Sequence, residues 1–111
     1  MTEKSRKYLS DILMAVELIE EFTVGINEYS LYDADRKTQS AVERQLAIIG
    51  EALNQFRKLE PQIKIENDKQ IVAFRNRLVH AYDSLDNSIV WAILNRHLNP
   101  LKVEVRKLAD E

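Results

Sequence analysis

The feature that most constrains the fold is an apolar stripe near the middle of the chain. Its members, spaced by three and four positions, are Val42, Leu46, Ile49, Leu53 and Phe56. Side chains at this spacing lie along one side of an α-helix, so the stripe predicts a helix from about residue 34 or 37 to Leu59, which Pro61 ends. Near-heptad spacing of this kind suits close antiparallel packing against other helices.

Gly50 is the exception within this predicted helix. A glycine in a helix interior costs about 1 kcal/mol relative to alanine, and Gly50 is directly next to Ile49 of the stripe. We therefore expect another stretch of backbone to cross the helix closely at this position.

Four further helices are predicted from apolar periodicity and boundary residues, at about 5–26, 69–82, 87–98 and 99–108. Residues 27–35 and 60–66 read as connections between them. The expected N-terminal caps are Asp33 or Asp35 for the second helix, Asn67 or Asp68 for the third, Asp86 or Asn87 for the fourth, and Asn99 before Pro100 for the last.

The composition supports an all-α fold. The chain has 111 residues, of which 45% are hydrophobic, with only two Gly and two Pro, which disfavours a turn-rich β architecture. This length is sufficient for one ordinary domain. We predict a single domain over residues 1–111, an up-down helical bundle of four long helices and a short C-terminal helix.

Charge and cysteine content limit the classes of function. The chain has no cysteine, so it has neither disulfides nor thiolate metal ligands. Its charged N-terminus and interrupted apolar runs fit neither a signal peptide nor a membrane span, so we expect a cytoplasmic protein with no membrane partner. A formal net charge of −2 argues against coating nucleic acid by bulk electrostatics, so any RNA contact must be local.

The segment Phe74–Tyr82 places polar side chains within a helical pattern. At about 100° per residue, Asn76 and His80 fall nearly opposite the apolar stripe of this helix, and Asp83 would extend the same polar column. Such a column can hold a phosphodiester. From spacing and composition alone, a solvated helix face with a surface histidine is the simpler interpretation.

The same helix has a second apolar edge, formed by Val72 and Val79. Arg75 and Tyr82 fall between this edge and the core stripe. A helix with two apolar edges is best explained if it packs on its own bundle and on a second subunit, which predicts a homodimer.

The spacing Arg-x4-His-x-Tyr, formed by Arg75, His80 and Tyr82, resembles the signature of the HepT-like branch of HEPN-domain ribonuclease toxins. Residues 49–52 (Ile-Gly-Glu-Ala), residues 86–91 and the order of the helices are similar to that family too. A polar residue after the arginine, here Asn76, matches the broader HEPN pattern.

The resemblance implies an endoribonuclease that needs no metal or other cofactor and cuts RNA with the RNA's own 2′-hydroxyl as nucleophile. It implies Arg75, Asn76 and His80 as the catalytic residues. A histidine can exchange protons near neutral pH, and an arginine can stabilise the charge that develops on phosphoryl oxygens.

One imidazole cannot readily serve as both base and acid in one step, and the chain's other histidine, His97, is distant from the motif. A two-fold dimer would bring two copies of Arg75, Asn76 and His80 into one cleft, in keeping with the family's dimers. His97 is expected to interact with a helix terminus or with solvent.

Tyr82 has two interpretations. As a structural residue, it packs its ring between the apolar edges and leaves its hydroxyl in water. As a functional residue, the resemblance implies that a minimal nucleotidyltransferase, the antitoxin of a toxin-antitoxin pair, transfers AMP from ATP onto it. Phosphate-bearing groups so close to His80 would block the cleft and repel RNA.

Two alternatives stay open. Glu51 and Arg44, seven positions apart on the second helix, either brace the motif or form solvated surface pairs. The whole chain could also be a non-catalytic helical adaptor that binds a nucleotidyltransferase or another protein.

Overall fold

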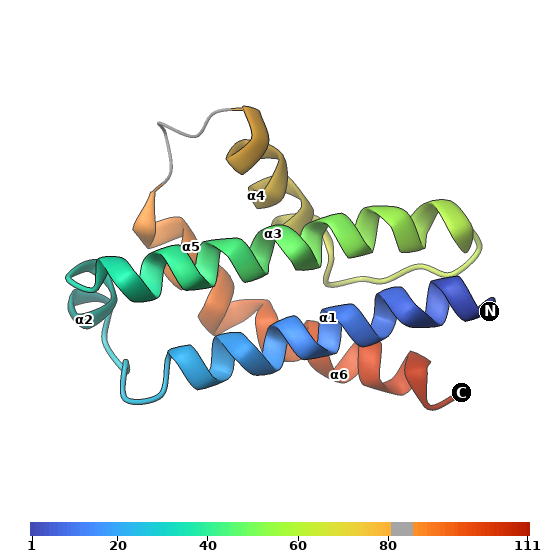
Figure 1. Ribbon diagram of the computed structural model, residues 1–111, viewed down its shortest axis with the longest axis horizontal. Coiled ribbons are helices and arrows are strands. Elements are labelled where there is room, and N and C mark those ends of the chain that lie inside the picture. The colour runs from blue at the N-terminus through green and yellow to red at the C-terminus, as the bar shows by residue number, and fades with distance from the viewer. Residues whose placement is uncertain (81–85) are drawn as a thin grey trace.

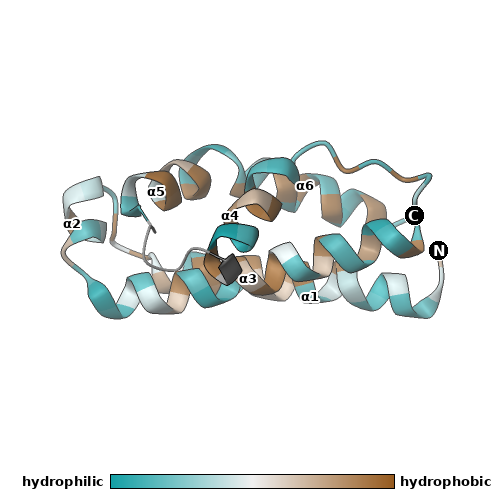
Figure 2. Cartoon of the chain, turned by 90° about the horizontal axis from the view of Figure 1, so that it is seen from above, coloured by the Kyte–Doolittle hydropathy of each residue, from teal (hydrophilic) through white to brown (hydrophobic). Residues whose placement is uncertain are grey.

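The computed structural model describes residues 1–80 and 86–111, including the side chains of all of these except residues 79 and 80. The described residues form six α-helices and no strand. In one layer, α1 (Glu3–Phe22) and α3 (Arg36–Leu59) lie side by side and antiparallel, while α5 (Asn87–Arg96) and α6 (Leu98–Ala109) follow one another along a second layer (Figures 1 and 2). The predicted all-α class is confirmed.

Two elements differ from the expected bundle. The connection before α3 contains a one-turn helix, α2 (Tyr29–Asp33), and α6 has 12 residues, as many as α4 (Lys69–His80), so the last helix is not short. Residues 60–66 form the predicted loop. None of the described helices is both long enough and apolar enough to cross a membrane.

Side-chain caps fix where three of the helices begin. Thr2 Oγ1 accepts a hydrogen bond from the Ser5 amide at 3.1 Å, Asp35 accepts one from Thr38 at 3.0 Å, and Asp86 accepts one from Ser88 at 2.8 Å. These bonds satisfy amides that lack a partner within the helix. Asp35 and Asp86 were each one of two predicted caps.

Two helix boundaries lie away from their predicted positions. α1 ends at Phe22 rather than near residue 26, because the chain turns through Gly25, whose φ of 82° lies in the left-handed region that glycine tolerates best. α6 begins at Leu98, one residue before the predicted cap Asn99. Pro100 lies in its first turn, where the missing N–H breaks no helix bond.

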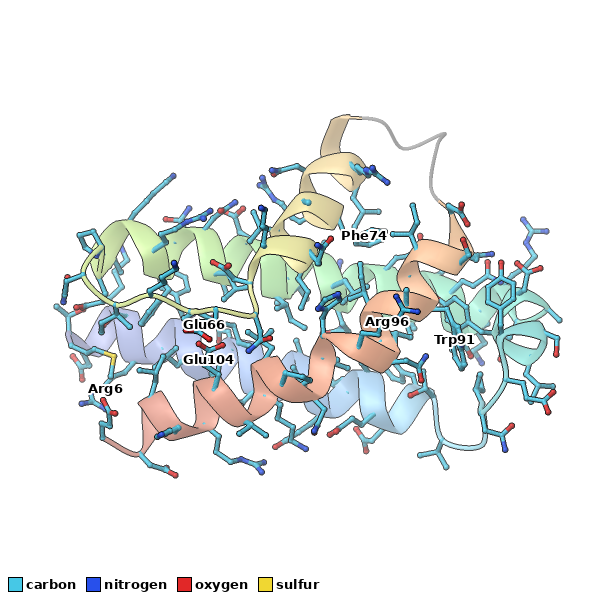
Figure 3. All side chains as sticks on the ribbon, turned by 180° about the vertical axis from the view of Figure 1, so that it is seen from behind. Arg6, Glu66, Phe74, Trp91, Arg96 and Glu104 are labelled. Atoms are coloured by element: carbon cyan, nitrogen blue, oxygen red, sulfur yellow. The ribbon has the colours of Figure 1, made fainter. Side chains whose placement is uncertain are left out.

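The core lies between the two layers, where the apolar faces of the helices meet (Figure 2). All five members of the α3 stripe are buried, as are Leu9, Ile12, Val16 and Ile19 of α1. Trp91 of α5 is half-buried at the end of the bundle and stacks on the ring of Tyr32 with centroids 5.7 Å apart (Figure 3). Trp91 thus packs against the hydrophobic core.

The start of α4 is fixed from the other end of the sequence. Glu104 of α6 accepts hydrogen bonds from the amide of Glu66 at 2.7 Å and from the amide of Asn67 at 3.1 Å, and Figure 3 shows Glu66 and Glu104 facing one another. From this anchored end, α4 crosses α3 and rises away from the α1–α3 layer (Figure 1). Its C-terminal half therefore projects from the bundle.

Candidate active site

The candidate site is built where α4 crosses α3, and Gly50 sets the closeness of that crossing. A Cβ atom at Gly50 would overlap Cβ of Arg75, would lie 2.9 Å from its Cγ, and would lie 3.3 Å from the carbonyl oxygen of Ile71. Only a residue without a side chain leaves room for α4 at this separation. The predicted close crossing is confirmed, and the element that crosses is the helix that carries the motif.

The core stripe and the polar face of α4 follow the predicted arrangement: Ile71 and Phe74 are buried against the bundle, and Asn76 is exposed. Val72 differs, because the second apolar edge was expected to pack on a second subunit and this member of it is buried within its own chain. Arg75 is half-buried, as expected for a position between the two apolar edges. The helical geometry thus places an arginine at the boundary between the core and solvent.

Arg75 is held by two neighbours. Its Nη2 atom lies 2.5 Å from Oε2 of Glu51 on α3, and its Nη1 atom donates a hydrogen bond to Oδ1 of Asn76 at 3.1 Å. Gln55, one turn after Glu51 on α3, donates from Nε2 to the other carboxylate oxygen at 2.9 Å. Glu51 therefore contacts the motif arginine, as the bracing alternative requires of this residue.

An open groove of about 690 Å³ begins at Arg75 and crosses the exposed face of α3 toward α1. Its apolar floor includes Ala47, Ile48 and Leu78, and its polar lining comprises Tyr8, Asp11, Ser40, Glu43, Arg44, Glu51 and Arg75. Burial raises the pKa of the Glu43 carboxyl. Among the described residues Arg44 has no ion pair, so it lines the groove rather than bracing Arg75.

The remaining predicted site residues lie partly outside the described region. α4 extends to His80, so positions 76 and 80 are one helical turn apart on the same element. The side chain of His80, all of Tyr82 and the predicted extension of the column to Asp83 fall outside the described residues. The positions of these three side chains therefore stay predictions.

His97 lies at the junction of α5 and α6. Its backbone amide donates to the carbonyl of Ile93 at 2.9 Å, and its own carbonyl accepts from Leu101 at 3.1 Å. Its side chain makes no capping hydrogen bond. The backbone of His97 therefore lies at a helix terminus, as expected, and the interaction of its side chain stays a prediction.

Two contributions to the site have no signal in the sequence. Gln55 steadies Glu51, and Tyr8 and Asp11 come from α1 to line the far side of the groove. The period of a helix tells which residues share a face, whereas the register between two helices depends on how their side chains interlock. A search for polar residues three or four positions from Glu51 would have found Gln55 together with Asn54, but neither Tyr8 nor Asp11.

Comparison with known proteins identifies the family. A profile of the family described as Ribonuclease HepT-like matches residues 12–108. The chain is 38% identical, over 97% of its length and 98% of the relative, to a probable ribonuclease HepT of Thermococcus cleftensis.

Two proteins of Methanocaldococcus jannaschii are also similar. A putative RNase is 34% identical over 90% of this chain and 92% of its own length, and a gamma-glutamylcyclotransferase and putative RNase is 30% identical over 100% of this chain and 50% of its own. No solved structure gives a significant match. The chain belongs to the HepT-like ribonuclease family.

Proposed function

We propose that this protein is the toxin of a toxin-antitoxin pair, a metal-independent endoribonuclease whose active site forms at the interface of a homodimer. The observation that carries the proposal is the arginine of the family motif, held by Glu51 and Asn76 at the end of a groove, on the helix that also carries His80. The family assignment supports an RNA substrate.

The proposed reaction is an in-line attack within the RNA chain. The 2′-oxygen forms a bond to phosphorus while the bond to the 5′-oxygen breaks, and the products are a 2′,3′-cyclic phosphate and a free 5′-hydroxyl. A base removes the proton of the 2′-hydroxyl, and an acid gives a proton to the leaving 5′-oxygen. His80 of one protomer acts as the base and His80 of its partner as the acid, which is why the proposal requires a dimer.

Arg75 acts on the charge of the phosphate. A guanidinium has five N–H donors and stays protonated, so it can keep its contacts to Glu51 and Asn76 and still donate to the phosphoryl oxygens. Asn76 accepts from Nη1 of Arg75 through its side-chain oxygen, and in this proposal its amide N–H groups donate to the RNA. Removal of one donor to a developing oxyanion lowers kcat by about 10²–10³-fold.

The dimer interface is proposed on the exposed side of α4. The C-terminal half of this helix projects from the bundle (Figure 1), and the side of α3 next to it exposes Ile48. Pairing of α4 with its symmetry mate would cover this side and bring the two motif helices together. Sedimentation analysis should then give a dimer, and dilution below its dissociation constant should lower the specific activity. A protein that cuts RNA equally well as a monomer would rule out the shared site.

The nuclease assay uses purified protein and a labelled RNA in the presence of EDTA. Cleavage should persist, and the products should end in cyclic phosphate and 5′-hydroxyl groups. Arg75→Ala and His80→Ala should each lower cleavage at least 10²-fold. Arg77→Ala is the matched control, because it removes the same charge from an exposed position of the same helix. If Arg75→Ala and His80→Ala cut like the wild type, the site assignment is wrong.

We further propose that a minimal nucleotidyltransferase neutralises the toxin by transferring AMP onto Tyr82. The support is the match of Tyr82 to the last position of the family motif. Co-expression with a nucleotidyltransferase encoded beside this gene should add AMP units to the peptide that contains Tyr82, as measured by mass spectrometry. Full neutralisation without any added mass would instead show inhibition by binding, and a wild type without nuclease activity would support the adaptor alternative.

A further inference from the structure

Among the motif residues with described side chains, Arg75 is contacted both at its first side-chain atoms, Cβ and Cγ (its root), and at its guanidinium (its tip). The two contacts come from adjacent residues of α3. Gly50 receives Cβ and Cγ of Arg75, and Glu51 pairs with its guanidinium. An arginine side chain has several rotatable bonds and a high rotamer entropy when it is free. Two neighbouring positions of one rigid helix therefore define where this long side chain begins and where it ends.

The ion pair is poorly suited to stabilising the fold. The side chains of Arg75 and Glu51 keep 26% and 46% of their surface exposed, and solvent screening leaves exposed pairs with little net effect on stability. The carboxylate also offsets part of the positive charge that would attract RNA, which lowers the affinity for the proposed substrate. A role for Glu51 is therefore to be sought in the geometry of Arg75.

The geometry of the pair fits such a role. Glu51 contacts Nη2 and Asn76 contacts Nη1, so the two ends of the planar guanidinium are held by different residues. Because Gln55 holds the second oxygen of Glu51, the carboxylate itself is oriented. Among the described residues, each terminal nitrogen has one such contact, and a guanidinium has five N–H donors, so it can keep both contacts and still donate to a phosphate.

We propose that Glu51 is a positioning residue, steadied by Gln55, that orients the guanidinium of Arg75 toward the scissile phosphate at a cost in RNA affinity. This inference rests on the proposed nuclease function. It predicts that loss of Glu51 has opposite effects on the two steps, with slower cleavage and tighter binding. A merely structural role would weaken both.

The test compares Glu51→Ala, Glu51→Gln and Gln55→Ala in steady-state cleavage and in binding of RNA with a 2′-deoxy group at the scissile position. Glu51→Ala should lower kcat by about 10- to 100-fold, as expected for misplacement of a catalytic group by about 1 Å. It should lower KM, and the Kd of the non-cleavable RNA, by about two- to fivefold at low salt. Glu51→Gln keeps an acceptor oxygen, so it should share the tighter binding with a smaller loss of kcat.

Two variants separate charge from position. Gln55→Ala leaves the charge of Glu51 in place and should lower kcat by a few-fold without changing Kd, since only the orientation is loosened. Glu21→Gln is the matched control, because it removes an exposed carboxylate that does not line the groove. It should leave both Kd and kcat unchanged. A Glu51→Ala protein with wild-type kcat, or one with weaker RNA binding, would overturn the proposal.

A readout that does not depend on cleavage separates this proposal from the proposed function. Rotation about the Cζ–N bonds of Arg75 can be followed by NMR of its guanidinium nitrogens in the free protein. Rotation should be hindered in the wild type and about tenfold faster in Glu51→Ala, because a charge-assisted contact is lost. If Arg75→Ala abolishes cleavage and Glu51→Ala leaves it unchanged, the positioning role alone is refuted. If rotation is hindered in the wild type but the wild type cuts no RNA, the nuclease function is refuted, and with it the role of Glu51 in cleavage.

Discussion

Replacement of Gly50 by alanine tests whether the close crossing of α4 and α3 places Arg75. The added Cβ would overlap Cβ of Arg75 and lie 2.9 Å from Cγ. The α4 backbone fixes the position of Cβ, so rotation about χ1 can move Cγ but cannot relieve the Cβ contact. Carbon atoms pack at about 3.5–4.0 Å. The helix must therefore move away from α3 by roughly 1 Å at this point.

The expected change in stability is small, because two effects oppose one another. Alanine in a helix interior is more favourable than glycine by about 1 kcal/mol, whereas overpacking of a close contact costs about 1–3 kcal/mol. Gly50→Ala should therefore lower the free energy of unfolding by about 0–2 kcal/mol. A shift of about 1 Å in a catalytic group can nevertheless cost about 10²-fold in rate.

The assay combines urea unfolding followed by circular dichroism with cleavage of a labelled RNA under single-turnover conditions. Gly50→Ala should unfold at a urea concentration close to that of the wild type and cut RNA about 10- to 100-fold more slowly. The matched control is Gly25→Ala. Position 25 has a φ of 82° and open space around it, so alanine there is strained by about 1 kcal/mol without touching the site.

Comparison of the two glycine variants decides the question. Gly25→Ala should lose about 1 kcal/mol of stability, within the range expected for Gly50→Ala, and keep wild-type activity. If Gly50→Ala is as active as Gly25→Ala, the crossing at Gly50 does not determine the position of Arg75. If both variants lose activity in proportion to their loss of stability, the rate effect reflects unfolding rather than geometry.

Three further predictions concern the scaffold and the groove. Glu104→Ala should lower the free energy of unfolding by about 1–3 kcal/mol, because it removes the charged acceptor at the start of α4, and Lys107→Ala on the same helix should not. The pKa of Asp35 is held below its ordinary value, chiefly by the Thr38 hydroxyl and amide, so its contribution to stability is present above the unfolded-state pKa and is lost as the pH falls through the folded value. Asp35→Asn lacks this titration, so the stability difference from wild type, measured by urea unfolding, should shrink between pH 6 and pH 3, and a constant difference would contradict the assignment. Arg44→Ala should weaken binding of a non-cleavable RNA and lower the salt slope by about 1, whereas an unchanged Kd would rule out an RNA path through the groove.

The helical periods predict the parts of the structure that depend on one helix at a time. The stripe from Val42 to Phe56 is buried throughout, and Asn76 is exposed, because burial along a single helix follows its 100° repeat. Gly50 also allows a contact between elements to be predicted, because a residue that is unfavourable in an otherwise regular helix indicates that another element packs closely there. α2 escaped prediction because a helix of five residues is too short to show a period.

What the sequence does not predict is the contact between residues far apart in the chain. Glu104 caps the loop before α4 from 37 and 38 positions away, and no local pattern marks a glutamate in a helix interior as a cap for another helix. The contact of Glu51 with Arg75 is not predicted either. The spacing of Glu51 from Arg44 defines a face of α3 but not where α4 packs on that face. Such contacts are fixed by packing between helices, which the period of either helix alone does not determine.

Positions 50 and 51 depend both on the period of a single helix and on the packing between two helices. A glycine stands where α4 approaches α3 most closely, and the next residue along an α-helix points about 100° away. The side chain of Glu51 can therefore pass the crossing and reach the guanidinium of Arg75, whose Cβ and Cγ lie against Gly50. In this structure the crossing is centred on position 50, and Glu51 contacts the guanidinium of Arg75. We therefore expect that moving the glycine one position in either direction separates the root of Arg75 from the carboxylate that holds its tip.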